Sequence, residues 1–323
     1  MRQTGIEFGA VGEAHFVDLG APPALKPTEL LVVTEFSAMT NGTERHALLA
    51  EHGWPGGGRH GYQHVGRVVR MGTAVDAFKV GDRVFVGQYT GHRGWQVVDV
   101  GVVNPVGFLE PLVITLPNDL DPAACALMGV AGVALRGARR FRIEPAQRVW
   151  VAGQGLIGHF AAQAARALGA RVVVSDIHPE RLALGKQCGA HGALDASAPD
   201  FYEQLAAQGP FNCLIDACGT LSLLQDILDH RLLAYRGVIG LLAVRTETSF
   251  QWGMLHQTEA SIEVSCHFGR EDLRVLLHFM QQGTINIAPV ITHTAPVDQA
   301  IDLYAQLRDH PASMLGVVFD WTQ

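Results

Sequence analysis

The spacing of apolar residues in the first third of the chain predicts short strands. Apolar stretches bounded by turn-forming residues predict strands at 28–39, 64–72 and 82–88. Four glycines and a proline within 54–61 predict a loop between the first two strands. This part of the chain therefore predicts a compact β-rich domain.

From about residue 121 the pattern changes to strands alternating with helices. Asp121 and Pro122 form a helix start, because a capping side chain stands before a proline at the first helical position. The alternating elements are expected at 121–140, 148–152, 156–168, 171–175, 179–190, 211–218, 221–233 and 237–243. Such alternation predicts an α/β fold with a doubly wound parallel sheet. The last fifty residues predict amphipathic helices at 270–284 and 296–310 and a closing strand at 314–321.

Composition narrows the class of protein. A chain of 323 residues, 48% hydrophobic and 17% charged, is typical of a globular protein of about two domains. The net charge of −7, without a basic stretch, argues against nucleic acid or an anionic membrane as a partner. No long apolar run or apolar leader is present, which predicts a cytoplasmic protein without a membrane span. Five scattered cysteines without a C-x-x-C pair exclude a four-cysteine zinc lobe.

A glycine-rich motif follows the predicted strand at 148–152 and opens the next helix. Its residues are Gly153, Gln154, Gly155, Leu156, Ile157 and Gly158. The first glycine permits a tight turn, the second lets a pyrophosphate approach the backbone, and the third lets the helix pack close to the strand. Free N–H groups at the helix start then face the phosphate charge. The motif and its context predict a Rossmann dinucleotide site.

Residues after the next strand indicate which dinucleotide binds. Asp176 follows Gly158 by 18 residues and can accept hydrogen bonds from both ribose hydroxyls, but it would repel a 2′-phosphate. Ile177 comes next, and Arg181 is placed to lie over the adenine. These features favour NAD over NADP. Because ligands gather at the carboxyl ends of parallel strands, the nicotinamide contacts are expected at Cys218, Gly219 and Ala243.

Two segments outside this motif carry a family resemblance. The segment 61–86, GYQHVGRVVRMGTAVDAFKVGDRVFV, looks like G-H-E-x-x-G-x-V…V-G-D-R-V, and 41–46, NGTERH, looks like C-G-[ST]-D of zinc alcohol dehydrogenases. With the glycine motif, nearly the whole chain resembles the medium-chain dehydrogenase/reductase superfamily. The resemblance implies a GroES-like β-rich catalytic domain and a homodimer, or a dimer of dimers, joined near residues 260–266. It also implies the domain bounds. Residues 1–130 and 269–323 form the catalytic domain, and residues 131–268 form the Rossmann domain that binds NAD.

The chain departs from the superfamily where the catalytic zinc would bind. The cysteine ligand falls on Asn41, the histidine ligand on Tyr62, its neighbouring glutamate on Gln63, and the third ligand near Leu127. Because zinc needs three or four N, S or O ligands, these changes predict a zinc-free branch with no metal. Within that branch, N-G-T-E and the ending at 314–321 look similar to the group containing bacteriochlorophyllide hydroxyethyl dehydrogenase.

Without zinc, side chains must move the proton of the reacting hydroxyl. By resemblance, Tyr62 should point at the reacting oxygen and exchange its proton there. The alternative is that its ring only fills the space that zinc occupies in the zinc-dependent enzymes. Thr43 falls on a residue that contacts the substrate hydroxyl, the alternative being a turn or cap hydroxyl. His46 falls on a relay histidine, and imidazole exchanges protons near neutral pH. The alternative is a surface histidine.

Two further residues of the same segment have supporting roles. Glu44 is expected to orient its neighbours, paired with Arg45 or Arg67. Asn41 is expected to hydrogen-bond the substrate or the nicotinamide ribose. Together these residues predict a zinc-independent, NAD-dependent dehydrogenase that oxidises a small secondary alcohol, with cyclic alcohols and polyols as candidates, to a ketone. Two alternatives stay open: a zinc-free reductase of activated C=C bonds, as in enoyl and quinone reductases, and a non-catalytic dinucleotide-binding protein.

Overall fold

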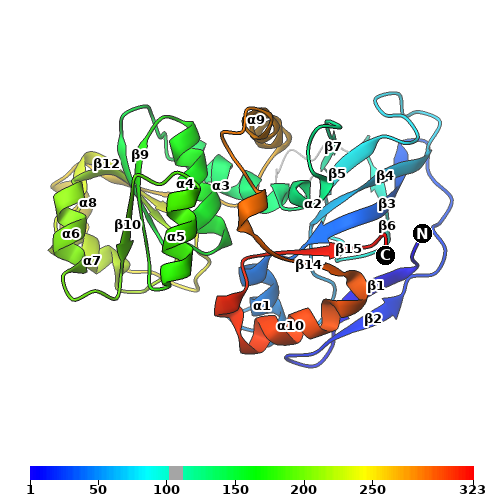
Figure 1. Cartoon of the computed structure of the whole chain (residues 1–323), viewed down its shortest axis with the longest axis horizontal. Helices are drawn as coiled ribbons and strands as arrows, with labels where there is room; N and C mark the ends of the chain where they lie inside the picture. Colours follow the sequence, from blue (N-terminus) through cyan, green and yellow to red (C-terminus); the bar gives the residue numbers. More distant parts are fainter. Residues whose placement is uncertain (102–111) are drawn as a thin grey trace. The chain divides into compact units, whose positions relative to one another are not determined.

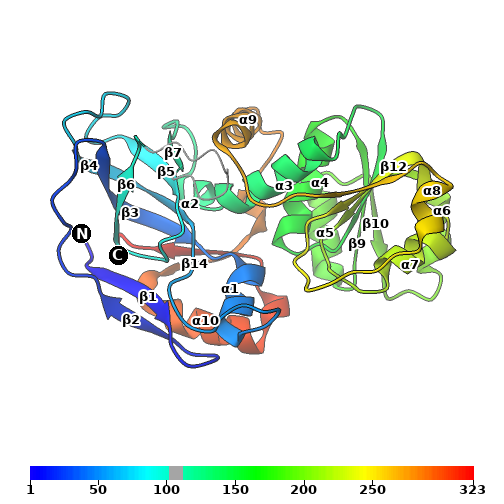
Figure 2. The same cartoon turned by 180° about the vertical axis from the view of Figure 1, so that it is seen from behind.

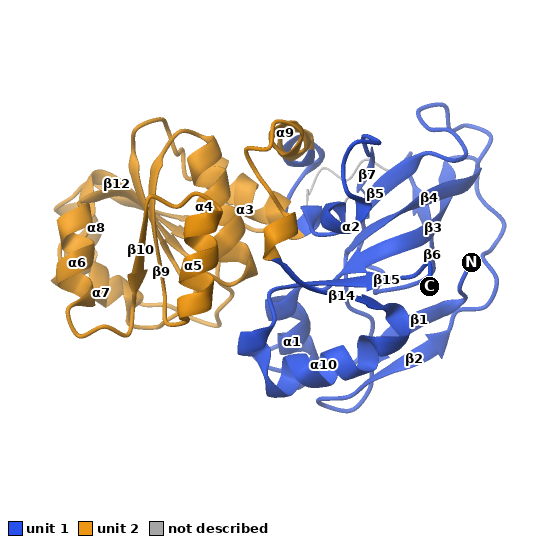
Figure 3. Cartoon of the chain, viewed as in Figure 1, with its two compact units in different colours: residues 1–129, 268–273, 291–323 blue, residues 130–267, 274–290 orange. Residues whose placement is uncertain are grey.

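The structure, a computed structural model, describes residues 1–101 and 112–323 and divides the chain into two compact units (Figure 3). Unit 1 comprises 1–129, 268–273 and 291–323, and unit 2 comprises 130–267 and 274–290. The segment 274–290 was expected in the first domain, but it belongs to unit 2. One contact that holds it there is the backbone N–H of Asn286, which donates to Oε1 of Gln163 at 2.7 Å.

Unit 2 is built on a parallel sheet. Its strands are β8 (Arg148–Ala152), β9 (Arg171–Asp176), β10 (Gly192–Asp195), β11 (Phe211–Asp216), β12 (Leu233–Leu241) and β13 (Ser261–Val264). They lie in the order β10-β9-β8-β11-β12-β13, and every neighbouring pair is parallel. The order reverses between β8 and β11, and open parallel sheets bind ligands at such a switch point, beyond the carboxyl ends of the strands.

Helices cover both faces of this sheet, as Figures 1 and 2 show. One face carries α3 (Met128–Arg140), α4 (Leu156–Ala167) and α5 (Pro179–Gln187), and the other carries α6 (Phe201–Gln208), α7 (Leu223–Asp229) and α8 (Trp252–His256). Central strands buried on both sides read as continuous apolar runs, which is why 149–152 and 172–174 are almost wholly apolar and buried. The predicted doubly wound parallel sheet is confirmed.

Unit 1 is built on a mixed β-sheet and a separate two-stranded sheet. Its strands are β1 (Thr4–Phe8), β2 (Ala14–Asp18), β3 (Glu29–Ala38), β4 (Gln63–Met71), β5 (Arg83–Gly87), β6 (Trp95–Asp99), β7 (Leu112–Thr115), β14 (Ile291–Pro296) and β15 (Gly316–Asp320). The larger sheet has the order β14-β15-β3-β4-β5-β7, and β6 also pairs with β3. β1 and β2 pair with each other, and β1 also forms single bridges through Gly5 to Arg93 and through Phe8 to Gly58. The predicted separate β-rich domain is confirmed.

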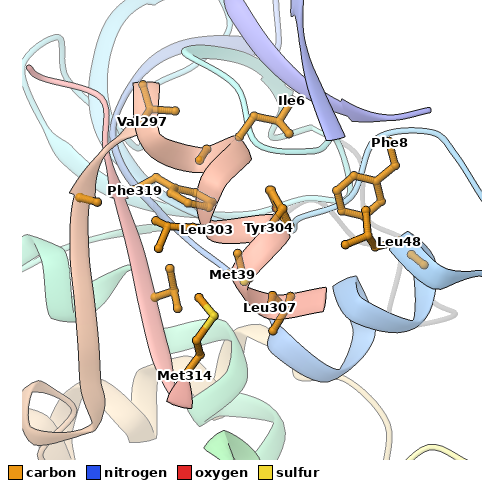
Figure 4. Close-up of a cluster of buried hydrophobic side chains, with 14 of the residues drawn as sticks. Ile6, Phe8, Met39, Leu48, Val297, Leu303, Tyr304, Leu307, Met314 and Phe319 are labelled. Atoms are coloured by element: carbon orange, nitrogen blue, oxygen red, sulfur yellow. The ribbon is translucent and has the colours of Figure 1, made fainter. Parts of the chain in front are cut away.

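Among the described residues of unit 1, the α-helices α1 (Asn41–Leu49), α2 (Pro122–Cys125) and α10 (Ala300–Asp309) accompany the sheets. A further helix, α9 (Arg270–Gln281), begins in unit 1 and ends in unit 2. Figure 4 shows the core in which Phe8, Leu48, Tyr304 and Phe319 pack together from four elements. This core fixes α1, which carries most of the predicted catalytic residues.

One predicted helix is divided in the structure. The segment expected as a helix at 121–140 forms α2 and α3, separated at Ala126 and Leu127. The predicted helix start is confirmed, because the side chain of Asp121 accepts a hydrogen bond from the N–H of Ala123 at 3.0 Å. Within the described ranges, the helices are all too short or too polar to traverse a lipid bilayer.

Candidate functional site

The glycine-rich turn between β8 and α4 has the geometry that its sequence predicts. Gly153 has φ +90°, a backbone conformation that residues with a side chain rarely adopt. A Cβ on Gly158 would lie 1.9 Å from the carbonyl oxygen of Gly153, so only glycine fits there. At Gly155, by contrast, no described atom lies within 4 Å of where a Cβ would stand. The backbone at Gly155 is therefore open to an approaching group.

Asp176 ends β9 beside this turn. Its side chain is buried, and its carboxylate accepts hydrogen bonds from the N–H groups of Gln154 at 2.7 Å and His178 at 2.9 Å. The Nη1 atom of Arg181 lies 3.9 Å from one of its oxygens. Asp176 therefore links the glycine-rich turn to the start of α5 and places a fixed negative charge at the carboxyl end of the sheet.

A cavity of about 490 Å³ lies within unit 2 at this edge. Its lining residues are Trp150, Ala152, Gly153, Gly155, Ser175, Asp176, Ile177, His178, Arg181, Ala196, Phe201, Tyr202, Ala217, Cys218, Thr220, Ser222, Leu223 and Asp226. The cavity thus brings together six residues that the sequence placed at a dinucleotide: Gly153, Gly155, Asp176, Ile177, Arg181 and Cys218. The other five predicted cofactor residues are not in its lining: Leu156, Ile157, Gly158, Gly219 and Ala243.

Asp216, which sequence reasoning missed, organises the loop after β11. Its Oδ1 atom accepts hydrogen bonds from the N–H groups of Cys218 at 3.1 Å and Gly219 at 2.8 Å. Its backbone oxygen accepts from the N–H of Ala243 at 3.1 Å, and its other carboxylate oxygen pairs with Arg245. Gly219 and Ala243 are therefore held together by one buried aspartate, although neither lines the cavity.

Several lining residues were also missed. Ala196 directly follows β10, Thr220 lies just past β11, and Phe201 and Tyr202 open α6. The rule that ligands gather beyond the carboxyl ends of parallel strands could have found the first two. The two aromatic residues carry no such signal, because they reach the cavity from a helix on one face of the sheet.

In unit 1, the four predicted catalytic residues of the segment 41–46 all lie on α1. The amide nitrogen of Asn41 donates to the carbonyl oxygens of Met314 at 3.1 Å and Leu315 at 2.7 Å. Asn41 therefore fastens the helix start to the chain before β15. Thr43 is half-buried in the same turn. His46 is half-buried, and its Nδ1 atom lies 3.1 Å from Oε2 of Glu51.

Glu44 is fully buried, and its partners are not the predicted ones. Arg45 pairs with Glu51 and Arg67 with Glu35, so neither expected pairing of Glu44 forms. Instead, Nε2 of His92 lies 3.0 Å from Oε2 of Glu44. The prediction was wrong because the partner comes from a distant loop rather than from a neighbour in sequence.

Further hydrogen bonds complete the surroundings of Glu44. The hydroxyl of Tyr304 donates to Oε2 at 2.5 Å, and the N–H of Thr40 donates to Oε1 at 2.6 Å. Burial raises the pKa of the Glu44 carboxyl, but the interactions with His92, the backbone N–H of Thr40 and the hydroxyl of Tyr304 together leave this pKa below its ordinary value. Glu44 is therefore an anion held in the interior of unit 1.

Tyr62 lies directly before β4 and is buried among aromatic rings. Its ring centroid is 5.0 Å from that of Tyr89 and 5.9 Å from that of Phe268. The neighbouring Gln63 donates from its amide to the hydroxyl of Thr40, the residue before α1, at 3.2 Å. Through this bond the chain at Tyr62 is tied to the start of the helix that carries the other predicted catalytic residues.

The parallel sheet, the glycine-rich turn and the cavity with Asp176 are together typical of a Rossmann dinucleotide-binding unit. A family model described as "Zinc-binding dehydrogenase" matches residues 157–282. L-threonine 3-dehydrogenase of Alteromonas mediterranea is 30% identical over 264 residues, which cover 74% of this chain and 76% of that protein. The chain belongs to the medium-chain dehydrogenase/reductase superfamily and is an oxidoreductase of the alcohol dehydrogenase-like type.

Solved structures show the same fold. 2R,3R-butanediol dehydrogenase from Bacillus subtilis superposes with a TM-score of 0.83 at 18% identity, covering 98% of this chain and 99% of that one. A putative zinc-binding dehydrogenase from Sinorhizobium meliloti, bound to NADP, superposes with a TM-score of 0.81 at 21% identity, covering 98% of each chain. At these identities the likeness establishes the fold alone.

The residues at the superfamily's zinc positions do not suit zinc. The amide nitrogen of Asn41 is committed to two carbonyl oxygens, the ring of Tyr62 packs on aromatic rings, and Leu127 is buried and apolar. Cys125 lies two residues from Leu127 and is itself buried in α2. Asn41, Tyr62 and Leu127 therefore present no thiolate or imidazole for zinc.

Proposed function

We propose that this protein is a zinc-independent, NAD-dependent dehydrogenase that oxidises a secondary alcohol, of the cyclic or polyol type, to a ketone. The observation that carries the proposal has two parts. Unit 2 contains a cavity lined by residues predicted to bind a dinucleotide. In unit 1, the residues at the superfamily's zinc positions offer no thiolate or imidazole. A dehydrogenase without zinc must handle the hydroxyl proton with its own side chains.

Asp176 supports the choice of NAD. Its carboxylate is fixed by two backbone N–H groups on the wall of the cavity, and one of these groups belongs to the glycine-rich turn. In our proposal the remaining lone pairs of this carboxylate accept the ribose hydroxyls, whereas its charge disfavours a 2′-phosphate. Gly155 and the start of α4 then receive the pyrophosphate, and Ile177 and Arg181 flank the adenine.

The bound dinucleotide supplies the hydride acceptor. Loss of hydride from the alcohol carbon must be matched by loss of the hydroxyl proton, and we assign that proton transfer to Tyr62. Thr43 and His46 are proposed to relay it onward along α1, while Asn41 and Glu44 position this helix. The contacts of Asn41 with residues 314–315 and of Glu44 with His92 support positioning roles, because they anchor the helix at its first turn.

The same residues underlie the proposed place within the superfamily. A zinc-free branch fits Asn41 and Tyr62 better than a zinc-dependent one does. The likeness of N-G-T-E and of the chain ending to the group containing bacteriochlorophyllide hydroxyethyl dehydrogenase stays a prediction from sequence.

We also propose a homodimer joined through β13, or a dimer of two such pairs. Within the described ranges no strand pairs with the outer edge of β13, and exposed sheet edges favour pairing with a second chain. Val264 on this strand is 58% exposed, and Val244 and Trp252 in the same unit are exposed as well. Light scattering of the purified chain, which should give twice the monomer mass or more, tests this proposal.

The test of the reaction uses enzyme that has been dialysed against a chelator and analysed for metal. We expect such enzyme to reduce NAD⁺ with members of a panel of secondary alcohols and polyols, followed as NADH absorbance, and to be slower with NADP⁺. Added Zn²⁺ should not increase the rate. Activity that disappears on chelation and returns with Zn²⁺ would contradict zinc independence.

A second assay separates the alternative reaction. The chelated enzyme is supplied with NADH or NADPH and an α,β-unsaturated ketone. Reduction of the C=C bond, together with no oxidation of any alcohol in the panel, would replace our proposal by the reductase alternative. Ketone reduction to an alcohol under the same conditions is the reverse of the proposed reaction and supports it.

A further inference from the structure

A cluster of metal-ligating side chains lies at the carboxyl end of α1. It consists of His46 in the last turns of the helix and of Glu51 and His52 just beyond it. One ligand atom from each residue lies within 4.8 Å of the other two. The closest pair is Nδ1 of His46 and Oε2 of Glu51, 3.1 Å apart, and the rings of His46 and His52 meet edge to face at 4.5 Å between centroids.

The backbone brings these three side chains together. Ala50 and His52 both have φ +52°, in the left-handed region, and the N–H of Glu51 donates to the carbonyl oxygen of His46 at 2.9 Å. The chain therefore folds back over the end of the helix instead of leaving it along the axis. Residues five and six positions apart in sequence thus face one region of space.

The electrostatics of the cluster suit a cation. The carboxyl end of a helix carries partial negative charge from its last carbonyl groups. Glu51 adds a full negative charge, which Arg45 offsets at present through a 2.9 Å contact between Nη1 and Oε2. Nδ1 of His46 and Nη1 of Arg45 both contact the same oxygen of Glu51, Oε2, so an ion bound to this oxygen beside His46 competes with the guanidinium.

We propose that His46, Glu51 and His52 form a site for one divalent transition metal ion, with Zn²⁺ as the reference ion. Two imidazoles and one carboxylate suit Zn²⁺, Ni²⁺ or Cu²⁺ better than Mg²⁺ or Ca²⁺, which prefer oxygen ligands. Water completes the coordination, because His52 is exposed. The site uses neither Asn41 nor Tyr62, so it is separate from the superfamily's zinc positions.

Binding at this site has a chemical consequence for His46. A metal ligand must be the unprotonated imidazole, so ion binding displaces any proton shared between His46 and Glu51. A bound ion therefore occupies the ring to which our proposed function assigns proton relay. The metal site itself does not depend on that assignment, because its ligands and their spacing are the same whatever reaction the enzyme performs.

Calorimetric titration of the full chain, first stripped with chelator, with Zn²⁺ tests the proposal. We expect one ion per chain. His52→Ala should weaken binding by about tenfold or more, since even partners outside the ligand set cost 10–100-fold when removed. Arg45→Ala should tighten binding severalfold, because it removes the competing cation. His15→Ala, an exposed histidine of β2 in the same unit, should bind as the unmodified chain does.

Three outcomes would overturn the site: no Zn²⁺ binding by the stripped chain, unchanged affinity in His52→Ala, or weaker binding in Arg45→Ala. Circular dichroism of each variant shows whether it is folded. His52 is exposed beyond the end of α1, and Arg45 is half-buried within the helix. Dehydrogenase activity of the metal-free, unmodified chain keeps the two proposals apart. If this activity is retained, zinc independence stands whether or not the site binds Zn²⁺. If the activity is lost and returns with Zn²⁺, zinc independence fails, and the titration of His52→Ala still decides whether the ion is held at His46, Glu51 and His52.

Discussion

The Nε2 atom of His92 lies 3.0 Å from Oε2 of Glu44, although each of these residues is only 1% exposed. The other ring nitrogen of His92 lies 2.8 Å from the hydroxyl of Ser37, and the indole N–H of Trp321 donates to the same hydroxyl at 2.9 Å. With Tyr304 on Glu44, this network joins α1, β3, the loop before β6, α10 and the end of the chain. It is therefore the polar centre of unit 1.

The first prediction concerns the stability of this network. Glu44→Ala should lower the free energy of unfolding by about 3–5 kcal/mol, because His92 and Tyr304 would then be buried without their shared acceptor. Urea unfolding followed by tryptophan fluorescence measures the change. The control is Glu7→Gln, which removes the partly exposed pair with Arg59 and should cost at most about 1 kcal/mol. Equal effects of the two substitutions would argue against a structural role for Glu44.

His159 in α4 makes stability depend on pH. Its ring is buried, and neither nitrogen has a hydrogen-bond partner among the described residues. Burial, together with the charge of Arg181, lowers its pKa to about 4. In the folded protein this ring therefore stays neutral down to about pH 4, whereas in the unfolded chain it binds a proton below about pH 6.5. The neutral ring contributes about 3 kcal/mol to the free energy of unfolding. This contribution is complete above about pH 6.5 and is lost as the pH falls toward 4.

His159→Leu should flatten this part of the stability profile. Thermal unfolding at a series of pH values between 7 and 4 measures it, and the variant should lose less stability on acidification than the unmodified chain. His278→Leu, at an exposed position of α9 in unit 2, is the matched control and should leave the slope unchanged. An identical slope in His159→Leu would mean that this ring does not stay neutral in the folded protein.

Two glycines of the turn should respond differently to the same added methyl group. Gly158→Ala places a Cβ against the carbonyl of Gly153 and should destabilise unit 2 by at least about 1–3 kcal/mol. Gly155→Ala meets open space and an ordinary φ of −68°, so its melting temperature should barely change. Its Kd for NAD⁺ should nevertheless rise by about tenfold or more, or 1.4 kcal/mol. Unchanged NAD⁺ affinity in Gly155→Ala would place the pyrophosphate elsewhere.

The roles of these glycines could be predicted from sequence because they depend on local backbone geometry. The same holds for β8 and β9, whose predicted bounds at 148–152 and 171–175 match the structure within a residue. Helix α1 was not predicted, because its sequence NGTERHALL has little amphipathic pattern. Its stability comes from tertiary contacts at Asn41 and Glu44, and periodicity does not record such contacts.

The candidate site was predictable to the extent that it follows strand ends. Asp176 and Cys218 were found by this rule and line the cavity. The partners of Glu44 were not found, since His92 and Tyr304 lie 48 and 260 residues away in sequence. Pairings over such distances are set by how β-strands and helices pack, and that packing leaves no local pattern in the sequence.

Asp176→Asn tests the choice of dinucleotide. An asparagine keeps one oxygen that can accept from Gln154 or His178, so the turn should stay folded, but it removes the negative charge. The ratio of kcat/KM for NAD⁺ to that for NADP⁺ should fall by about tenfold or more, the equivalent of one charged hydrogen bond. Asp195→Asn, at the end of the neighbouring strand β10, is the control and should keep the original ratio. A preference for NADP⁺ in the unmodified enzyme would itself contradict the proposal.

Tyr62→Phe tests the proposed proton transfer. The ring keeps its contacts with Tyr89 and Phe268, so stability and NAD⁺ affinity should change little, while kcat for alcohol oxidation should fall by about 10²-fold or more, as expected for loss of a general acid or base. Steady-state kinetics and a fluorescence titration of NAD⁺ give the two quantities. Tyr235→Phe, at an exposed position of β12, is the control. If kcat is unchanged in Tyr62→Phe, the phenol only fills the space where related enzymes hold zinc, and the proton leaves by another route.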